Sequence, residues 1–136
     1  MAKTFQLEII ACDRSFYTGL CELLVFPGLD GERGILANHE AMVTCVGAGE
    51  LRFLYDGTWQ HAVVSAGFVQ VTPERVVLLA DTVERPEEID HNRAMEAKLR
   101  AQEQLRQKLS IKEYYNTKAA LNRAMARLKI KNKHVQ

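Results

Sequence analysis

The sequence predicts an α+β protein, in which an N-terminal antiparallel β-sandwich or flattened barrel is followed by a C-terminal antiparallel two-helix hairpin. Three observations indicate this division. All eight glycines lie between Gly19 and Gly67, and the last of the three prolines is Pro86. Strand-forming residues in alternating patterns precede that proline, and strong helix formers follow it. We therefore expect two domains, at residues 1–85 and 86–136.

The N-terminal residues carry the alternating pattern of a half-buried strand. Phe5, Leu7 and Ile9 share one face, with polar residues between them. A second run, residues 17–26, is rich in strand formers and ends in Pro-Gly and Asp-Gly turn signals, so we interpret it as a second strand. Residues 28–34 then form either a long turn or a loop that contacts another protein.

Two tight connections organise the rest of the first domain. Asp56-Gly57 lies between strand-like runs and supplies the pair of positive φ angles that a two-residue hairpin needs. Residues 72–74 (TPE) separate two further runs at 68–71 and 75–80. Short strands at this spacing, without a helical pattern between them, predict a two-sheet sandwich or flattened barrel.

The three cysteines occur in apolar, strand-like surroundings. Cys12, Cys21 and Cys45 are odd in number and form neither a CxxC motif nor a Cys/His cluster. Structural disulfides and a zinc site are therefore not expected. We predict that all three are small buried hydrophobic residues.

The second domain begins at a helix start signal. Pro86 can occupy the first turn of a helix but not interrupt one, and the two glutamates after it suit the positive end of the helix dipole. Helix formers continue over residues 89–109. Residues 110–113 (SIKE) match a capping box and predict a second helix that ends near Lys131.

The contact between the two predicted helices is made of small residues. Alanine lets backbones approach closely, but each buried methylene contributes only about 0.8 kcal/mol. The pair is therefore weakly held and can open. The expected stripe consists of Ala94, Ala97, Ala101 and Leu105 on the first helix and Ala119, Ala120, Ala124 and Leu128 on the second.

Composition and charge narrow the class of protein. The chain has no run of 18 apolar residues and no signal-peptide pattern, so we expect a protein made and kept in the cytoplasm. Residues 1–86 carry six Lys/Arg against eleven Asp/Glu, whereas residues 87–136 carry twelve against six. The net charges of −5 and +6 indicate that the two parts face different electrostatic partners, or each other.

The sequence is poor in catalytic signatures. It has no nucleophile elbow and no paired carboxylate motif, and its four histidines are scattered. The glycine-rich residues 28–34 lack the Gly-Lys-Ser/Thr ending of a phosphate-binding loop. We therefore expect no enzymatic activity, no metal site and no prosthetic group.

Arginines at helical spacing form the strongest candidate site. Asp90, Arg93 and Arg100 share a face of the first helix, and Arg123 and Arg127 share one on the second. Antiparallel folding would bring the four guanidiniums around one place, with Ile89 and Asp90 at its rim. Guanidinium groups suit phosphate oxygens, which makes a polyphosphate the natural ligand. The alternative is an ordinary solvated face with weak helical ion pairs.

Several stretches, in this order and spacing, resemble the epsilon subunit of F-type ATP synthases over essentially the whole chain. They are residues 31–36 (GERGIL) with Asn38-His39, then 66–69 (AGFV), 79–84 (LADTVE) and 89–94 (IDHNRA). The last of them fits the I/L-D-x-x-R-A motif of the nucleotide-binding bacterial members.

The resemblance implies a non-catalytic, central-stalk subunit of a proton-translocating ATP synthase. Its partners would be the gamma subunit, the c-ring and the catalytic α/β subunits, at the cytoplasmic face of the bacterial membrane. The helical hairpin would inhibit ATP hydrolysis when extended, and bound ATP would favour the compact form; the magnesium requirement stays open. The implied nucleotide-binding residues are Glu84, Ile89, Asp90, Arg93, Ala94, Arg100, Arg123 and Arg127.

Two other functions compete with this one. A basic hairpin could belong to an adaptor that binds nucleic acid or an acidic protein, although neither glycines nor a regular pattern of aromatic residues is interleaved with its Lys and Arg. A standalone nucleotide sensor would need no gamma subunit at all. We expect no nucleic-acid partner.

Overall fold

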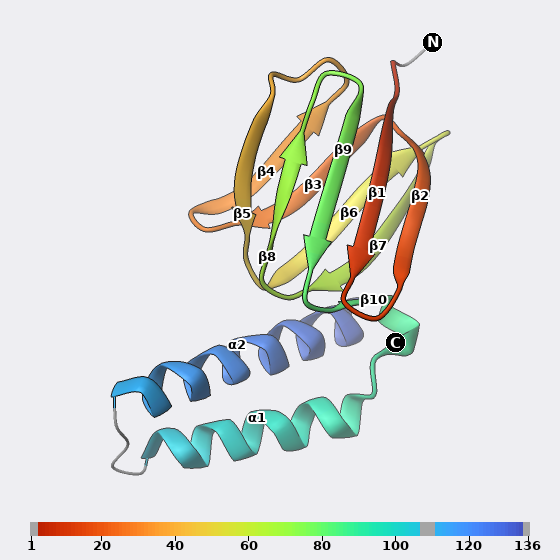
Figure 1. The fold of residues 1–136 in the computed structure, drawn as a ribbon. Helices are drawn as coiled ribbons and strands as arrows, with labels where there is room; N and C mark the ends of the chain where they lie inside the picture. The colour runs from red at the N-terminus through yellow and green to blue at the C-terminus, as the bar shows by residue number, and fades with distance from the viewer. Residues whose placement is uncertain (1–2, 107–110, 135–136) are drawn as a thin grey trace. The chain divides into compact units, whose positions relative to one another are not determined.

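The computed structural model describes residues 3–106 and 111–134 and divides into two compact units, Met1–Glu84 and Arg85–Gln136. The first unit consists of strands in two sheets, and the second contains a short 3-10 turn and two helices (Figure 1). The predicted fold class, a β-sandwich followed by a helical hairpin, is confirmed.

One sheet has the strand order β2-β1-β9-β8-β5. Its β1 and β9 run parallel, whereas the other neighbours are antiparallel as the sequence predicts. A parallel pair needs a long connection, and here the rest of the sandwich supplies it. The strands are β1 (Phe5–Ala11), β2 (Ser15–Cys21), β5 (Met42–Val46), β8 (Gly67–Val71) and β9 (Arg75–Ala80).

The other sheet has the order β10-β7-β6-β3-β4 and is antiparallel throughout. The Asp56-Gly57 hairpin joins β6 and β7 as predicted, with φ angles of 52° and 73°. The strands are β3 (Leu23–Gly28), β4 (Gly31–Leu36), β6 (Gly49–Tyr55), β7 (Thr58–Val64) and β10 (Val83–Glu84).

The core lies between the two sheets. The predicted inward face of β1 is buried, with Phe5 3% exposed and both Leu7 and Ile9 fully buried. The facing sheet contributes aromatic side chains from β3 and β6, among them Phe26 and Phe53, which are also fully buried. This single cluster holds the first unit together because burial of large apolar side chains is its main source of stability.

Two expectations about the region of residues 17–34 were wrong. Residues 17–26 form two strands in different sheets, because the chain changes sheet at Glu22, whose N–H donates to the Leu54 carbonyl at 2.8 Å. Apolar residues lie on both sides of Glu22, so the sequence pattern does not show that the chain changes sheet there. Residues 28–34 are not a long loop: β3 and β4 pair directly across the turn at Leu29-Asp30.

The prediction of buried cysteines holds for one of the three. Cys21 is fully buried, and burial raises the pKa of its thiol to about 11. Cys12 and Cys45 are exposed, so the prediction was wrong for them. Cys12 donates to the Asp81 carboxylate at 3.4 Å, and this hydrogen bond raises the pKa of its thiol. Cys12 follows the end of β1, and Cys45 lies on the outward face of β5. The apolar neighbours of both cysteines in the sequence did not show this.

The second unit contains η1 (Pro86–Glu88), α1 (His91–Arg106) and α2 (Ile111–His134), with α1 and α2 side by side and antiparallel (Figure 1). The first α-helix thus begins at His91 rather than Ile89. Leu109 and the predicted capping box at Ser110 lie outside the described residues. None of the described helices is both long and apolar enough to cross a membrane.

The helix contact is the small-residue stripe that the sequence predicts, with one exchange. Ala94, Ala101, Ala124 and Leu128 are buried, and Ala97, Leu105 and Ala120 are partly buried. Ala119 is exposed, so its place in the stripe was wrong. Thr117 is buried instead, and its hydroxyl lies 3.5 Å from the Gln104 side-chain oxygen of α1. Because threonine is polar, the predicted stripe of small apolar residues did not include it.

Gly67, at the start of β8, is expected to be intolerant of any side chain. A Cβ there would meet the Leu79 carbonyl oxygen and lie 2.7 Å from the Ala80 Cα, both in the neighbouring backbone. We expect Gly67→Ala to lower the free energy of unfolding by about 3 kcal/mol or more, because a sheet backbone cannot move aside locally. Chemical denaturation followed by circular dichroism measures this.

Gly57→Ala is the matched control, since Gly57 has a positive φ but open space around its Cα. Only the strain of the left-handed backbone applies there, so a loss of about 1 kcal/mol is expected. Equal losses at the two glycines would show that the close approach at Gly67 does not limit the sandwich.

Candidate nucleotide-binding surface of the hairpin

The break between η1 and α1 gives two of the predicted site residues their conformation. Ile89 is extended, with φ −79° and ψ 123°, and its N–H donates to the Pro86 carbonyl at 3.3 Å. Its side chain is 3% exposed. Ile89 therefore lies outside the helix, as a buried apolar residue directly before Asp90.

Asp90 is the N-cap of α1. Its Oδ1 accepts the Arg93 N–H at 3.1 Å, and its carbonyl accepts the Ala94 N–H at 3.0 Å. A carboxylate at this position satisfies an otherwise unpaired amide and opposes the positive end of the helix dipole. Because a carboxylate has about four acceptor positions, capping leaves Asp90 able to accept further hydrogen bonds.

The D-x-x-R spacing contains this cap signal, although the sequence-based expectation placed Asp90 on a face of the helix. An aspartate immediately before an apolar-periodic helix is a standard N-terminal signal. Pro86 also signals a helix start, and the predicted helix therefore began at Ile89 instead of His91. Asp90 thus lies at the N-terminal end of α1 and not on its side.

The four arginines share one position relative to the buried stripe of the hairpin. Each directly precedes a buried residue: Arg93 and Arg100 precede Ala94 and Ala101, and Arg123 and Arg127 precede Ala124 and Leu128. One residue turns a helix by about 100°. Because the two helices run antiparallel, the same offset on each helix places both pairs on the same side of the hairpin.

The arginines also lie within one stretch of the hairpin, about two helical turns long. Thr117 of α2 is opposite Gln104 of α1. In an antiparallel pair with equal rise per residue, Arg127 is then level with Ala94. By the same count, Arg123 falls between Arg93 and Arg100. The structure thus brings the four guanidinium-bearing residues to one stretch of one side.

The surroundings of three of these four arginines leave their charges open to a ligand. Arg93 and Arg100 are exposed, and Arg123 and Arg127 are partly buried. Within the described part of the chain, Arg93, Arg100 and Arg123 take part in no ion pair, whereas Arg127 does interact with other residues. Like charges that lack acidic partners repel each other, and a bound anion would relieve that repulsion.

Two predicted residues differ from the arginines in their surroundings. Ala94 is 5% exposed and belongs to the buried stripe. Glu84 belongs to β10 in the first unit, where it is partly buried and pairs in register with Val63. Its role in a nucleotide site stays a prediction from the resemblance.

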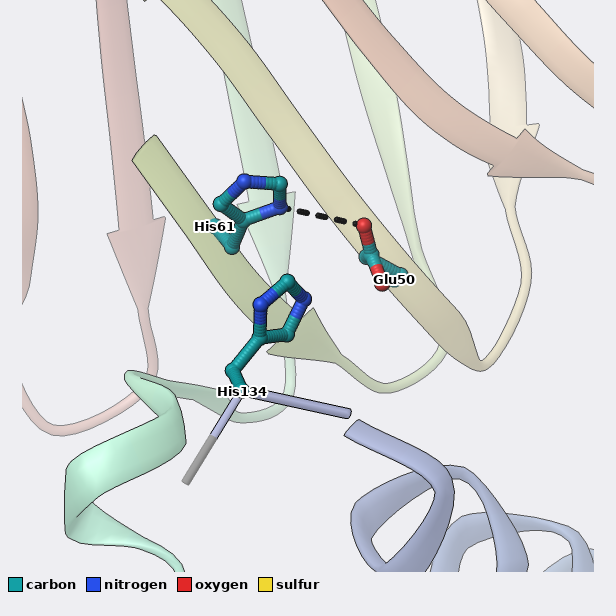
Figure 2. A group of neighbouring side chains, drawn as sticks. All are labelled: Glu50, His61 and His134. Atoms are coloured by element: carbon teal, nitrogen blue, oxygen red, sulfur yellow. Dashed lines mark hydrogen bonds and ion pairs between the residues drawn. The ribbon is translucent and has the colours of Figure 1, made fainter. Parts of the chain in front are cut away.

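The first unit holds a separate carboxylate–imidazole pair. Glu50 of β6 and His61 of β7 lie on neighbouring strands, and Glu50 Oε1 is 3.1 Å from His61 Nδ1 (Figure 2). Their side chains are 11% and 28% exposed, so the pair is largely shielded.

The described chain consists of a ten-stranded sandwich and a two-helix hairpin. Comparison with known proteins identifies the family that shares this arrangement. Residues 4–86 match the family model described as ATP synthase, Delta/Epsilon chain, beta-sandwich domain. Residues 87–132 match ATP synthase, Delta/Epsilon chain, long alpha-helix domain. The chain therefore belongs to the delta/epsilon chain family of ATP synthase, and the resemblance seen in the sequence is confirmed.

Relatives of similar length support this assignment. The ATP synthase epsilon chain of Ruminiclostridium cellulolyticum is 50% identical over 130 residues, which are 96% of this chain and 97% of the relative. That of Caldicellulosiruptor saccharolyticus is 44% identical over 126 residues, 93% and 92% of the two chains.

Solved structures share the fold. A chain from the mitochondrial ATP synthase of Euglena gracilis (OSCP/F1/c-ring) has a TM-score of 0.79 at 24% identity, over 90% of this chain and 78% of that chain. A chain from the central stalk/c-ring of the Tetrahymena thermophila enzyme has a TM-score of 0.71 at 9% identity, over 96% and 98%.

Replacing Asp90 separates its capping role from its charge. Asp90→Ala should lower the stability of α1 by about 1 kcal/mol, because the Arg93 amide loses its acceptor. Asp90→Asn keeps a capping oxygen and should lose far less. Hydrogen exchange of the first-turn amides of α1 measures both. Equal losses in the two variants would show that charge, rather than the cap, stabilises this end of the helix.

Proposed function

We propose that this chain is the non-catalytic epsilon subunit of the central stalk, or rotor, of a proton-translocating F-type ATP synthase. The match to epsilon chains over nearly the full length of both sequences carries this proposal. Its partners are the gamma subunit, the c-ring and the catalytic α/β subunits, and it couples rotation to proton transport. It acts at the cytoplasmic face of the bacterial membrane, held there by the complex.

The helical unit regulates the complex. In its extended form it inhibits ATP hydrolysis, and in its compact form it does not. A stripe of alanines supports this proposal, because such a contact buries little apolar area and lets the two helices separate at low cost. The excess of positive charge after residue 87 suits contact with acidic surfaces in the extended form.

ATP is the ligand that stabilises the compact form. The observation that carries this step is the clustering of four arginines on one side of the hairpin, within about two helical turns. Triphosphate oxygens accept paired hydrogen bonds from guanidinium groups and neutralise their charge. A ligand that needs both helices at once binds the compact form only, and therefore shifts the population toward it.

The remaining residues of the proposed site complete the contacts. Asp90 can accept hydrogen bonds from the ligand while it caps α1. Ile89 and Ala94 are 3% and 5% exposed, so they would shape the site through packing rather than present open apolar surface to the nucleotide. The resemblance adds Glu84 to this set. Whether magnesium accompanies the nucleotide does not alter the part played by the arginines.

The isolated chain is expected to bind one ATP, and Arg93→Ala or Arg123→Ala should weaken binding at least about tenfold, because each loses a charged phosphate contact. Isothermal titration calorimetry measures the affinity. Lys129→Ala is the matched control: Lys129 is an exposed cation two residues after Arg127, and two residues turn a helix by about 200°, so Lys129 lies away from the side that carries the arginines.

Equal weakening by Lys129→Ala and Arg123→Ala would mean that net charge alone attracts the nucleotide. The absence of binding by the unsubstituted chain would overturn the ATP proposal. It would leave the assignment to the stalk intact, because that rests on the family.

Truncation after Glu88 tests the inhibitory role. The shortened subunit keeps the whole sandwich, which has its own core, and should still assemble with the gamma subunit and the c-ring. ATP hydrolysis by the reconstituted complex should then rise severalfold, because the inhibitory helices are missing. Unchanged hydrolysis in a correctly assembled complex would remove the inhibitory role and leave the structural one.

A further inference from the structure

Two corners of the sandwich, where the chain passes from one sheet to the other, are bonded to each other. Ser65 and Ala66 connect β7 to β8, and Asp81 and Thr82 connect β9 to β10. The Ser65 N–H donates to the Thr82 carbonyl at 3.1 Å, and the Asp81 N–H donates to the Ala66 carbonyl at 3.1 Å. The second corner leads directly to the end of the first unit.

The side chain of Ser65 reinforces this contact. Ser65 is 3% exposed, and its Oγ accepts both the Thr82 N–H at 2.8 Å and the Thr82 hydroxyl at 3.0 Å. A buried hydroxyl with two short hydrogen bonds to one residue fixes that residue in place. Replacement by an apolar side chain would leave a buried amide without its acceptor.

A third contact holds the next residue. Arg14 Nη2 donates to the Val83 carbonyl at 3.0 Å, and the Val83 side chain is 2% exposed. Strand β10 has two residues, opposite Val64 and Val63 of β7. So short a strand has few ladder hydrogen bonds of its own, and the contacts from Ser65 and Arg14 supply the rest.

We propose that Ser65, Thr82 and Arg14 form a clasp that keeps β10 on the sheet and thereby positions Glu84, the last residue of the sandwich. Ser65 is a positioning residue, because it acts on Glu84 through Thr82 and β10. When the clasp is closed, β10 stays on the sheet, and the segment that connects the sandwich to the helical unit begins at Arg85. When the clasp is open, β10 leaves the sheet, and that segment begins at Asp81. The consequence for nucleotide binding rests on the proposed function, which includes Glu84 in the ATP site.

Hydrogen exchange of the full chain tests the clasp itself. Ser65→Ala should speed amide exchange in residues 81–84 at least about tenfold, while amides in β6 and in the β1–β9 pair keep their protection, since opening is local. Thr72→Val is the matched control, because it removes a hydroxyl bond to the Arg75 carbonyl (2.9 Å) in the β8–β9 turn. That variant should leave residues 81–84 unchanged.

Arg14→Gln removes the third contact from an exposed position and should speed exchange in the same residues, so the clasp remains testable if Ser65→Ala does not fold. Unchanged exchange of residues 81–84 in both Ser65→Ala and Arg14→Gln, or faster exchange across the whole sandwich, would overturn the clasp.

A double-mutant cycle tests the positioning of Glu84. Ser65→Ala should weaken ATP binding about threefold or more in the unsubstituted chain and have no effect in a Glu84→Ala background, because coupled residues are not additive. Equal weakening in both backgrounds would overturn the positioning role. If the unsubstituted chain binds no ATP, the proposed function fails, and hydrogen exchange alone still decides whether the clasp exists.

Discussion

Apolar packing between the two sheets is the interaction on which the rest of this molecule depends. Large side chains such as Leu7, Ile9, Phe26 and Phe53 are removed from water there, whereas three of the six buried residues in the described helices are alanines. Most of the free energy of folding therefore belongs to the sandwich. The hairpin can change its conformation without loss of the sandwich, which is what a regulatory segment on a structural subunit requires.

The helical unit combines two features that oppose each other. Alanines at Ala94, Ala101 and Ala124 let the helices approach closely, yet the arginine beside each alanine adds charge to one side of the pair. Close approach favours the compact form, and repulsion between guanidiniums disfavours it. When two such terms nearly balance, a ligand with modest differential affinity shifts the population strongly.

Patterns of period two and local turn residues predicted much of the fold. Phe5, Leu7 and Ile9 identified an inward face, and Asp56-Gly57 identified a hairpin. The change of sheet at Glu22 escaped prediction because apolar residues continue through it, and it depends on a partner, Leu54, distant in sequence. At the candidate site, spacing grouped the arginines on one face of each helix, and their role in binding stays a prediction. The cap at Asp90 was missed, although an aspartate before a helix is a standard N-terminal signal, because Pro86 offered a competing helix start.

The parallel pairing of β1 with β9 has a consequence for how the chain folds as it is synthesised. Sheet closure joins Phe5–Ala11 to Arg75–Ala80, so the first strand must wait for nearly the whole sandwich to emerge from the ribosome. Contacts so distant in sequence form slowly, and β1 stays unpaired with β9 meanwhile. The helices emerge last, when every strand of the sandwich is already available. The subunit can thus acquire its stable sandwich before its helical unit is complete.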